Sequence, residues 1–145
     1  MPDRLEMARE SIAALNRRDV EAVVGAFASD AEWWPLRSST EGPYRGHDGV
    51  RAWFADTDEM FEHLRAEVEE VHERGDVVVA FGRLEAKGRE SGASVELVIS
   101  WVFRFADDKV IWAKSFADRD EAIAECGFEP RGVPRASGSS PEETR

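Results

Sequence analysis

The stretch that decides the fold runs from Val95 to Trp112 and reads VELVISWVFRFADDKVIW. Every odd-numbered position among its first eleven residues is apolar, whereas glutamate, serine and arginine occupy even positions. A period of two residues is typical of a long β-strand with one face buried. Asp107 and Asp108 then predict a tight turn. We therefore expect a second strand to return antiparallel beside the first.

Two further strands are expected before this hairpin, over residues 65–74 and 77–88, with a turn at Gly75 and Asp76. The returning strand is expected over 110–117. Each of these four strands meets the next through a short connection, and short connections join strands that are neighbours in space. The second half of the chain therefore predicts a four-stranded antiparallel meander.

The first half of the chain shows helical spacing, with apolar residues three and four positions apart. We expect helices over residues 3–17, 19–28, 48–64 and 118–126, and a short strand over 31–36. Aspartates at positions 19 and 118 are suited to begin two of these helices, because their side chains accept hydrogen bonds from free backbone N–H groups. The predicted class is α+β, with a curved antiparallel sheet wrapped over three N-terminal helices.

Length and composition limit the function classes. The chain has 145 residues, of which 42% are hydrophobic and 34% charged, and its net charge is -11. We expect one domain over residues 1–128 and a disordered tail over 129–145, which is rich in Pro, Gly and Ser. An acidic surface repels phosphate backbones and anionic lipid, so neither nucleic acid nor membrane is expected as a partner. Cys126 is the single cysteine, and no signal or membrane-spanning run is recognisable, so a cytoplasmic location is expected.

Six segments, in their order and spacing, resemble SnoaL-like domains of the nuclear transport factor 2-like (NTF2-like) superfamily. They are Leu15–Val23, Phe27–Pro35, Tyr44–Arg51, Gly75–Val79, Val102–Val110 and Ala117–Ala122. The resemblance covers residues 3–128 and implies a cone-shaped cavity between sheet and helices. The superfamily includes enzymes, binding proteins and scaffolds, so the resemblance implies a fold rather than an activity.

The catalytic positions of known enzymes with this fold are not retained. The aspartate base of the steroid isomerases corresponds to Trp34, their oxyanion tyrosine to Ser11 and their protonated aspartate to Trp101. An indole is no base and donates one hydrogen bond at most. The arginine and aspartates of the epoxide hydrolases correspond to Phe81, Arg83 and Ser115. The polyketide cyclases use a pocket aspartate or histidine, which the aligned positions do not clearly supply.

The candidate catalytic residues are Glu32, Arg83 and His47. A turn centred on Ser91 would set Phe81 opposite Trp101 and direct Arg83 into the cavity. A desolvated Glu32 would then serve as acid or base, and Arg83 would hold an anion. The alternative is that both residues lie at the rim of the cavity, where they are either solvated or structurally paired. His47 either is a base or supports the start of the third helix. No histidines have metal-ligand spacing, so no metal and no cofactor is expected.

The expected walls of the cavity are mostly aromatic. They are Trp34, Trp53, Phe81, Ile99 and Trp101, with Ser115 also facing inward. These tryptophans either form ordinary core or surround a flat apolar ligand. Ser115 faces inward if the loop after Phe105 has three residues, whereas a two-residue loop would place Lys114 there.

Three functions are compatible with these residues. The first is the binding of a small apolar or aromatic molecule without evident catalysis. The second is a SnoaL-like enzyme of cyclase, isomerase or hydrolase type, acting on a polyketide, terpenoid or aromatic compound. The third is a dimeric protein-interaction module. The outer sheet face contains Val98, Val102 and neighbouring apolar residues, which predicts a homodimer through that face. The identity of the ligand, and whether the protein is an enzyme, stay open.

Overall fold

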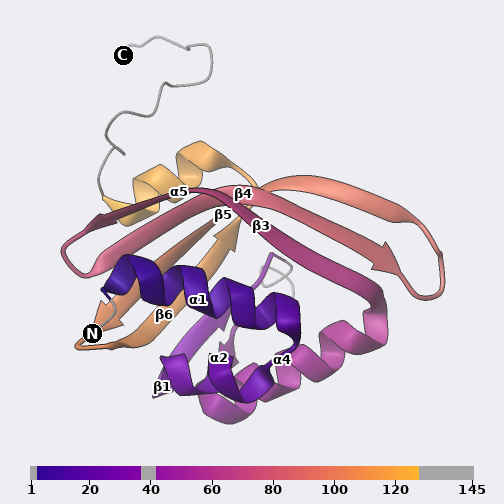
Figure 1. Cartoon of the computed structure of the whole chain (residues 1–145), viewed down its shortest axis with the longest axis horizontal. Coiled ribbons are helices and arrows are strands. Elements are labelled where there is room, and N and C mark those ends of the chain that lie inside the picture. Colours follow the sequence, from indigo (N-terminus) through magenta and orange to yellow (C-terminus); the bar gives the residue numbers. More distant parts are fainter. Residues whose placement is uncertain (1–2, 37–41, 128–145) are drawn as a thin grey trace, which may run out of the picture.

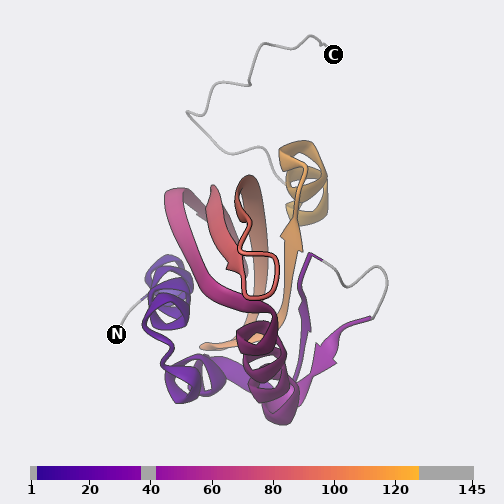
Figure 2. The same cartoon turned by 90° about the vertical axis from the view of Figure 1, so that its right-hand side faces the viewer.

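A single curved sheet separates two groups of helices in the computed structural model, which describes residues 3–36 and 42–127. Helices α1, α2 and α4 lie against one face of the sheet, and α5 lies on the opposite face (Figures 1 and 2). We call these the inner face and the outer face. The expected disordered tail, residues 129–145, lies outside the described residues.

Most helices come in the first half of the chain, and four consecutive strands come in the second half. The helices are α1 (Arg4–Arg17), α2 (Val20–Ala26), α4 (Gly46–Met60) and α5 (Arg119–Cys126). The strands are β1 (Phe27–Trp34), β2 (Tyr44–Arg45), β3 (Phe61–Arg74), β4 (Val77–Gly88), β5 (Ser94–Ala106) and β6 (Lys109–Phe116). Strands β3 to β6 form the predicted antiparallel meander, which confirms the α+β class. The sheet is mixed rather than antiparallel, because β6 pairs antiparallel with β5 on one side and parallel with β1 on the other.

Local sequence signals set the start of three of the four described helices. The carboxylates of Asp3, Asp19 and Asp118 each accept a hydrogen bond from a backbone N–H of the helix that follows. The third helix ends at Met60, so the prediction that it extends to Leu64 was wrong. Leu64 instead lies opposite Ala86 in the β3–β4 ladder. Pairing with a long neighbouring strand outweighs the helical spacing of these residues.

Both faces of the central strands are buried. On β5, the odd positions from Ile99 to Phe105 belong to the core under α1, α2 and α4. Val102 of β5 belongs instead to a second core, which α5 covers with Ala122 and Cys126. This packing explains why β4 and β5 are apolar on both sides: each face has its own helical layer.

A bulge in the last hairpin decides which way β6 faces. The turn at Asp107 and Asp108 is tight, with Ala106 paired to Lys109. The pairing then shifts by one residue around Ile111, so that Trp101 pairs with Ser115. One extra residue on a strand reverses the face of everything beyond it. Ser115 therefore faces inward as predicted, although the loop has two residues, whereas Ile111 is exposed.

The side chain of Asn16 fastens α1 to the edge of the sheet. Its Nδ2 donates to the carbonyl of Ala66 at 2.7 Å, and its Oδ1 accepts from the Ala66 N–H at 2.8 Å. The amide thus takes the place of a neighbouring strand along β3, which is an edge strand of the sheet formed by the described residues. This contact fixes the position of α1, whose residue Leu15 lines the cavity described next.

Candidate functional site

A cavity of about 350 Å³ lies between the inner sheet face and helix α4. We call it the main cavity. Its walls come from α1, β1 and the residues after it, α4 and the inner face of the meander. The lining residues are Leu15, Trp33, Pro35, Leu36, Trp53, Thr57, Met60, Phe61, Leu64, Leu84, Ala86, Val95, Leu97, Ile99, Trp101 and Ser115. None of these described residues is ionisable, so the cavity is an apolar environment with few polar groups.

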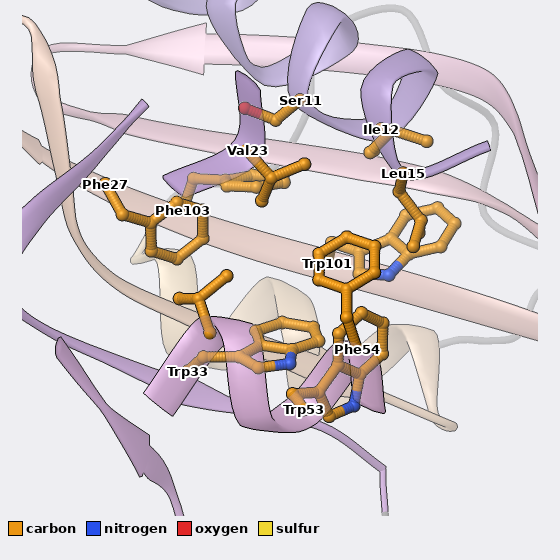
Figure 3. Close-up of a pocket in the computed structure, with 11 residues that line it drawn as sticks. Ser11, Ile12, Leu15, Val23, Phe27, Trp33, Trp53, Phe54, Trp101 and Phe103 are labelled. Carbon is orange, nitrogen blue, oxygen red and sulfur yellow. The ribbon is translucent and has the colours of Figure 1, made fainter. Parts of the chain in front are cut away.

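A smaller cavity of about 50 Å³ adjoins the main cavity and shares Leu15, Trp33, Trp53 and Trp101 with it. We call it the inner cavity. Figure 3 shows residues of α1 on one side of this space and the indoles of Trp33 and Trp53 on the other. The two indole rings are 5.4 Å apart between centroids and meet edge to face. Such aromatic contacts hold the rings in defined positions.

Three polar atoms in these walls have no hydrogen-bond partner within the described residues. They are Oγ of Ser11, Nε1 of Trp33 and Oγ1 of Thr57. Ser11 lines the inner cavity, Thr57 the main cavity and Trp33 both. Thr57 is only 1% exposed. Buried polar groups are paired in most native structures, so unpaired ones in a cavity wall are notable.

Four of the predicted wall residues line the main cavity: Trp53, Ile99, Trp101 and Ser115. The other two do not. Phe81 lies opposite Ser100 rather than Trp101 and packs in the second core under α5. The β4–β5 register differs by one residue from the one that a turn centred on Ser91 predicts, which places Phe81 on the outer face.

Trp34 also lies away from the cavity, because its neighbour Trp33 takes the inward position on β1. The Trp34 indole N–H donates to Glu32 at 3.0 Å. The ammonium group of Lys114 lies 5.5 Å from the Trp34 ring centroid, in cation–π range. Trp34 is thus part of the polar and aromatic surface beside α5, not a wall of the main cavity.

The expected Glu32–Arg83 pair does not form. Glu32 pairs with Arg45 across the β1–β2 ladder. Arg83 pairs with Glu96 at 2.6 Å on the exposed part of β4 and β5. The hydrogen bond from Arg83 holds the pKa of the Glu96 carboxyl below its usual value, and the same bond raises the pKa of Arg83. Glu32 and Arg83 therefore each have a partner at the surface, and neither faces the main cavity.

His47 supports the start of α4. Its Nε2 lies 2.7 Å from the backbone carbonyl oxygen of Phe27, at the junction of α2 and β1. His47 is not among the residues that line the main or the inner cavity. Within residues 3–36 and 42–127, no three acidic, histidine or cysteine side chains gather in a way that suits a metal ion. None of the described helices has the length and apolar character needed to cross a membrane.

The order of helices and strands around this cavity agrees with a family assignment from the sequence. The model of the SnoaL-like domain matches residues 8–113. The chain belongs to this family. The match ends within β6, so it includes most of the cavity walls of this SnoaL-like domain. No curated protein matches the chain.

Solved structures of the NTF2-like fold are similar to this SnoaL-like domain over most of its length. An NTF2-like protein of unknown function from Burkholderia pseudomallei is 26% identical, with a TM-score of 0.74, over 87% of this chain and 98% of that one. TerC, co-crystallized with polyporic acid, is 24% identical, with a TM-score of 0.72, over 85% and 96%. A hypothetical protein with a ketosteroid isomerase-like fold from Catenulispora acidiphila, in complex with trimethylamine, is 16% identical, with a TM-score of 0.71, over 91% of this chain and 100% of that one.

Trp33 and Thr57 of the SnoaL-like domain line the main cavity, although neither was predicted to do so from the sequence. A signal for Trp33 was available: Asp30 and Glu32 are charged, so the even positions of β1 belong outside and Trp33 inside. Thr57 follows Trp53 by four positions, one turn along the same face of α4. A threonine on an apolar helical face is commonly an ordinary core residue. Only the cavity beside Thr57 shows that it is a lining residue.

Proposed function

We propose that this SnoaL-like domain binds a small, flat, apolar or aromatic molecule in the main cavity, without an ionisable catalytic group. The observation that carries the proposal is the main cavity itself, which is about 350 Å³ in volume and lined by hydrocarbon and aromatic rings. Small-molecule sites are commonly concave, mostly apolar and of this size. Met60, Val95 and Leu97 line the cavity and are also exposed, so an apolar molecule would meet an apolar entrance.

Two relatives of the same fold support a small organic ligand. TerC was co-crystallized with polyporic acid, and the Catenulispora acidiphila protein was crystallized in complex with trimethylamine. These molecules differ widely in size and charge. The relatives therefore support small-molecule binding as a class, and the apolar walls of this chain favour the flat, uncharged end of that range.

The experiment that tests the proposal is native mass spectrometry of protein purified from its own host, followed by gentle denaturation. A co-purifying molecule that is released on denaturation would support the proposal and identify its class. Equilibrium dialysis against a panel of two- and three-ring aromatic compounds covers a ligand that is lost during purification. Absence of any bound molecule, together with no binding across the panel, would contradict the proposal.

The affinity for an uncharged ligand is expected to be independent of pH. Between pH 5.5 and 8.5 we expect less than about a twofold change, because no described residue of the cavity wall titrates. The carboxyls of Glu21 and Glu96 are held below their usual pKa by arginine partners. Their contribution to stability is complete above the usual carboxyl pKa and is lost only as the pH falls through their lowered pKa values, below this window. Equilibrium dialysis across the window checks this.

A change in affinity or turnover across this pH window that His47→Gln abolishes would point to His47 instead. An acid limb that Glu32→Gln abolishes would point to Glu32. Either result would favour the alternative function of a SnoaL-like enzyme, for which no described cavity residue offers an acid or a base.

We also propose that the protein is a homodimer. Helix α5 covers much of the outer sheet face through which the dimer was predicted to form. Val102 and Phe116 pack under α5, which leaves Val98, 62% exposed, as the main open apolar residue of the outer face. The Arg83–Glu96 pair lies beside it on the same strands. Sedimentation equilibrium is expected to give twice the mass of the chain, and a single-chain mass would contradict the dimer.

A further inference from the structure

Apolar side chains are exposed where the main cavity meets the surface, and one of them is a methionine. Met60, Val95 and Leu97 line this cavity and are 45%, 49% and 42% exposed. We call these three residues the mouth. Valine and leucine are chemically inert, whereas the thioether of methionine is oxidised to a polar sulfoxide. Met60 is therefore the mouth residue whose polarity an oxidant can change.

The backbone of Met60 is held in place independently of its side chain. Met60 is the last residue of α4, and its carbonyl oxygen accepts a hydrogen bond from the backbone N–H of Arg89 at 3.0 Å. The Arg89 side chain also donates from Nε to the carbonyl oxygen of Asp58 at 2.5 Å. These bonds join the end of α4 to the turn between β4 and β5 (Figure 1). A chemical change of the thioether is therefore expected to alter the surface of the mouth and to leave the fold in place.

The other methionines of the chain have different surroundings. The sequence contains three, of which Met1 lies outside the described residues. Met7 on α1 is partly buried and packs against the core. Oxidation requires contact between the oxidant and the sulfur, so susceptibility follows exposure. Met60 is therefore expected to react faster than Met7 in the folded protein.

Hydrogen peroxide is the class of oxidant that suits this position. It is small and uncharged, so the net charge of -11 does not repel it. The lone pair of the Met60 Sδ forms a new S–O bond with one peroxide oxygen, the O–O bond breaks, and the other oxygen leaves as water. The sulfur loses two electrons and the peroxide gains them, so no further reactant is needed.

We propose that Met60 is an oxidation site that controls ligand binding: its sulfoxide weakens the binding of an apolar molecule in the main cavity, and reduction to the thioether restores it. A sulfoxide oxygen covered by an apolar ligand would lose its hydrogen bonds to water, which costs affinity. The control of binding rests on the proposed function, whereas the faster oxidation of Met60 is independent of any ligand.

The first measurement is mass spectrometry of tryptic peptides after graded exposure of the folded protein to hydrogen peroxide. Tryptic cleavage places the three methionines in separate peptides, residues 1–4, 5–9 and 52–65. Fragment spectra distinguish oxidation of Met60 from oxidation of Trp53 in the third peptide. We expect Met60 to be oxidised about tenfold faster than Met7, and the two rates to become equal in guanidinium chloride. Equal rates in the folded protein would overturn the inference.

The second measurement is equilibrium dialysis with fluorene, an uncharged three-ring probe. We expect the oxidised protein to bind fluorene about tenfold more weakly, the factor that one poorly solvated polar group costs. Treatment with the two methionine sulfoxide reductases, one for each sulfoxide epimer, is expected to restore the affinity. Saturating fluorene is expected to slow the oxidation of Met60 and to leave the rate at Met7 unchanged.

Two leucine variants show which sulfur is responsible. Met60→Leu keeps an apolar side chain of similar volume and removes the sulfur, so peroxide is expected to leave its own affinity for fluorene unchanged. Met7→Leu is the matched control, and its affinity is expected to fall on oxidation as in the parent protein. Thermal unfolding of the oxidised parent protein is expected to match that of the reduced protein, which separates a loss of affinity from a loss of folding.

The outcomes separate the inference from the function beneath it. If fluorene binds equally well to parent protein with oxidised and with reduced Met60, the inference is wrong and the proposed function stands. An equal loss of affinity in the parent protein and in Met60→Leu would also overturn it, because another residue would then cause the effect. If fluorene and the aromatic panel do not bind and no molecule co-purifies, the proposed function fails and the control of binding fails with it.

Discussion

Replacing Gly82 by alanine is expected to destabilise the protein by about 3 kcal/mol, the upper end of what overpacking costs. A Cβ at this position would overlap the backbone carbonyl oxygen of Glu67 on β3. Gly82 lies opposite Val68, next to the place where the β3 register shifts by one residue. The two strands approach so closely there because β3 bends, and backbone atoms cannot move aside as a flexible side chain would. The bend contributes to the curvature that arches the sheet over the helices (Figure 1).

Denaturant unfolding followed by circular dichroism measures this loss, and thermal unfolding is expected to show a fall in melting temperature of roughly 10 °C. Gly25→Ala is the matched control. Gly25 lies in α2, and a Cβ there would have no atom within 4 Å. Because alanine favours a helix over glycine, the same chemical change is expected to stabilise by about 0.5–1 kcal/mol at Gly25. Equal effects at the two positions would show that the close approach at Gly82 has no energetic consequence.

Replacing Ala86 by tryptophan is expected to weaken ligand binding by at least about 100-fold, or about 2.7 kcal/mol. Ala86 lines the main cavity from the inner face of β4 and is 6% exposed. An indole at this position would extend into the space of about 350 Å³ and leave too little room for a ring system. The substitution fills empty apolar space rather than a close-packed core, so stability is expected to change little.

Equilibrium dialysis with the most tightly bound aromatic compound measures this effect, and thermal unfolding shows that the variant is folded. Ala52→Trp introduces the same side chain on the exposed surface of α4 and is expected to leave affinity unchanged. Unchanged affinity in a folded Ala86→Trp variant would mean that the ligand lies elsewhere. Loss of affinity in both variants would indicate a general effect of the added indole.

The inward-facing residues of the sheet were predictable where one face of a strand is polar, and not where both faces are buried. On β1, the charges of Asp30 and Glu32 distinguish the outer face from the inner face. On β4, the residues from Val77 to Gly82 are all buried, so the sequence pattern does not show which of them face the cavity. The side-chain period is two, and an error of one residue in the turn before β5 therefore placed Phe81 and Arg83 on the wrong face.

The sequence by itself determined the local structure. The capping aspartates, the helical spacing of the first half and the alternation of β5 were sufficient for the order of helices and strands, apart from the short strand β2. The SnoaL-like resemblance rested on the six quoted segments, and the family model confirms it. They also placed Ile99 and Trp101 at the cavity. These features depend on residues close together in the chain, where backbone propensity and side-chain period act directly.

Only the tertiary structure decided which side chains meet. The α5 layer over β4 and β5, the bulge at Ile111 and the parallel pairing of β1 with β6 each depend on contacts between residues distant in the sequence. The same contacts brought Trp33 and Thr57 to the main cavity and gave Glu32 and Arg83 separate partners. The physical reason is that strand register and face are set by turns and packing, and no single segment contains that information.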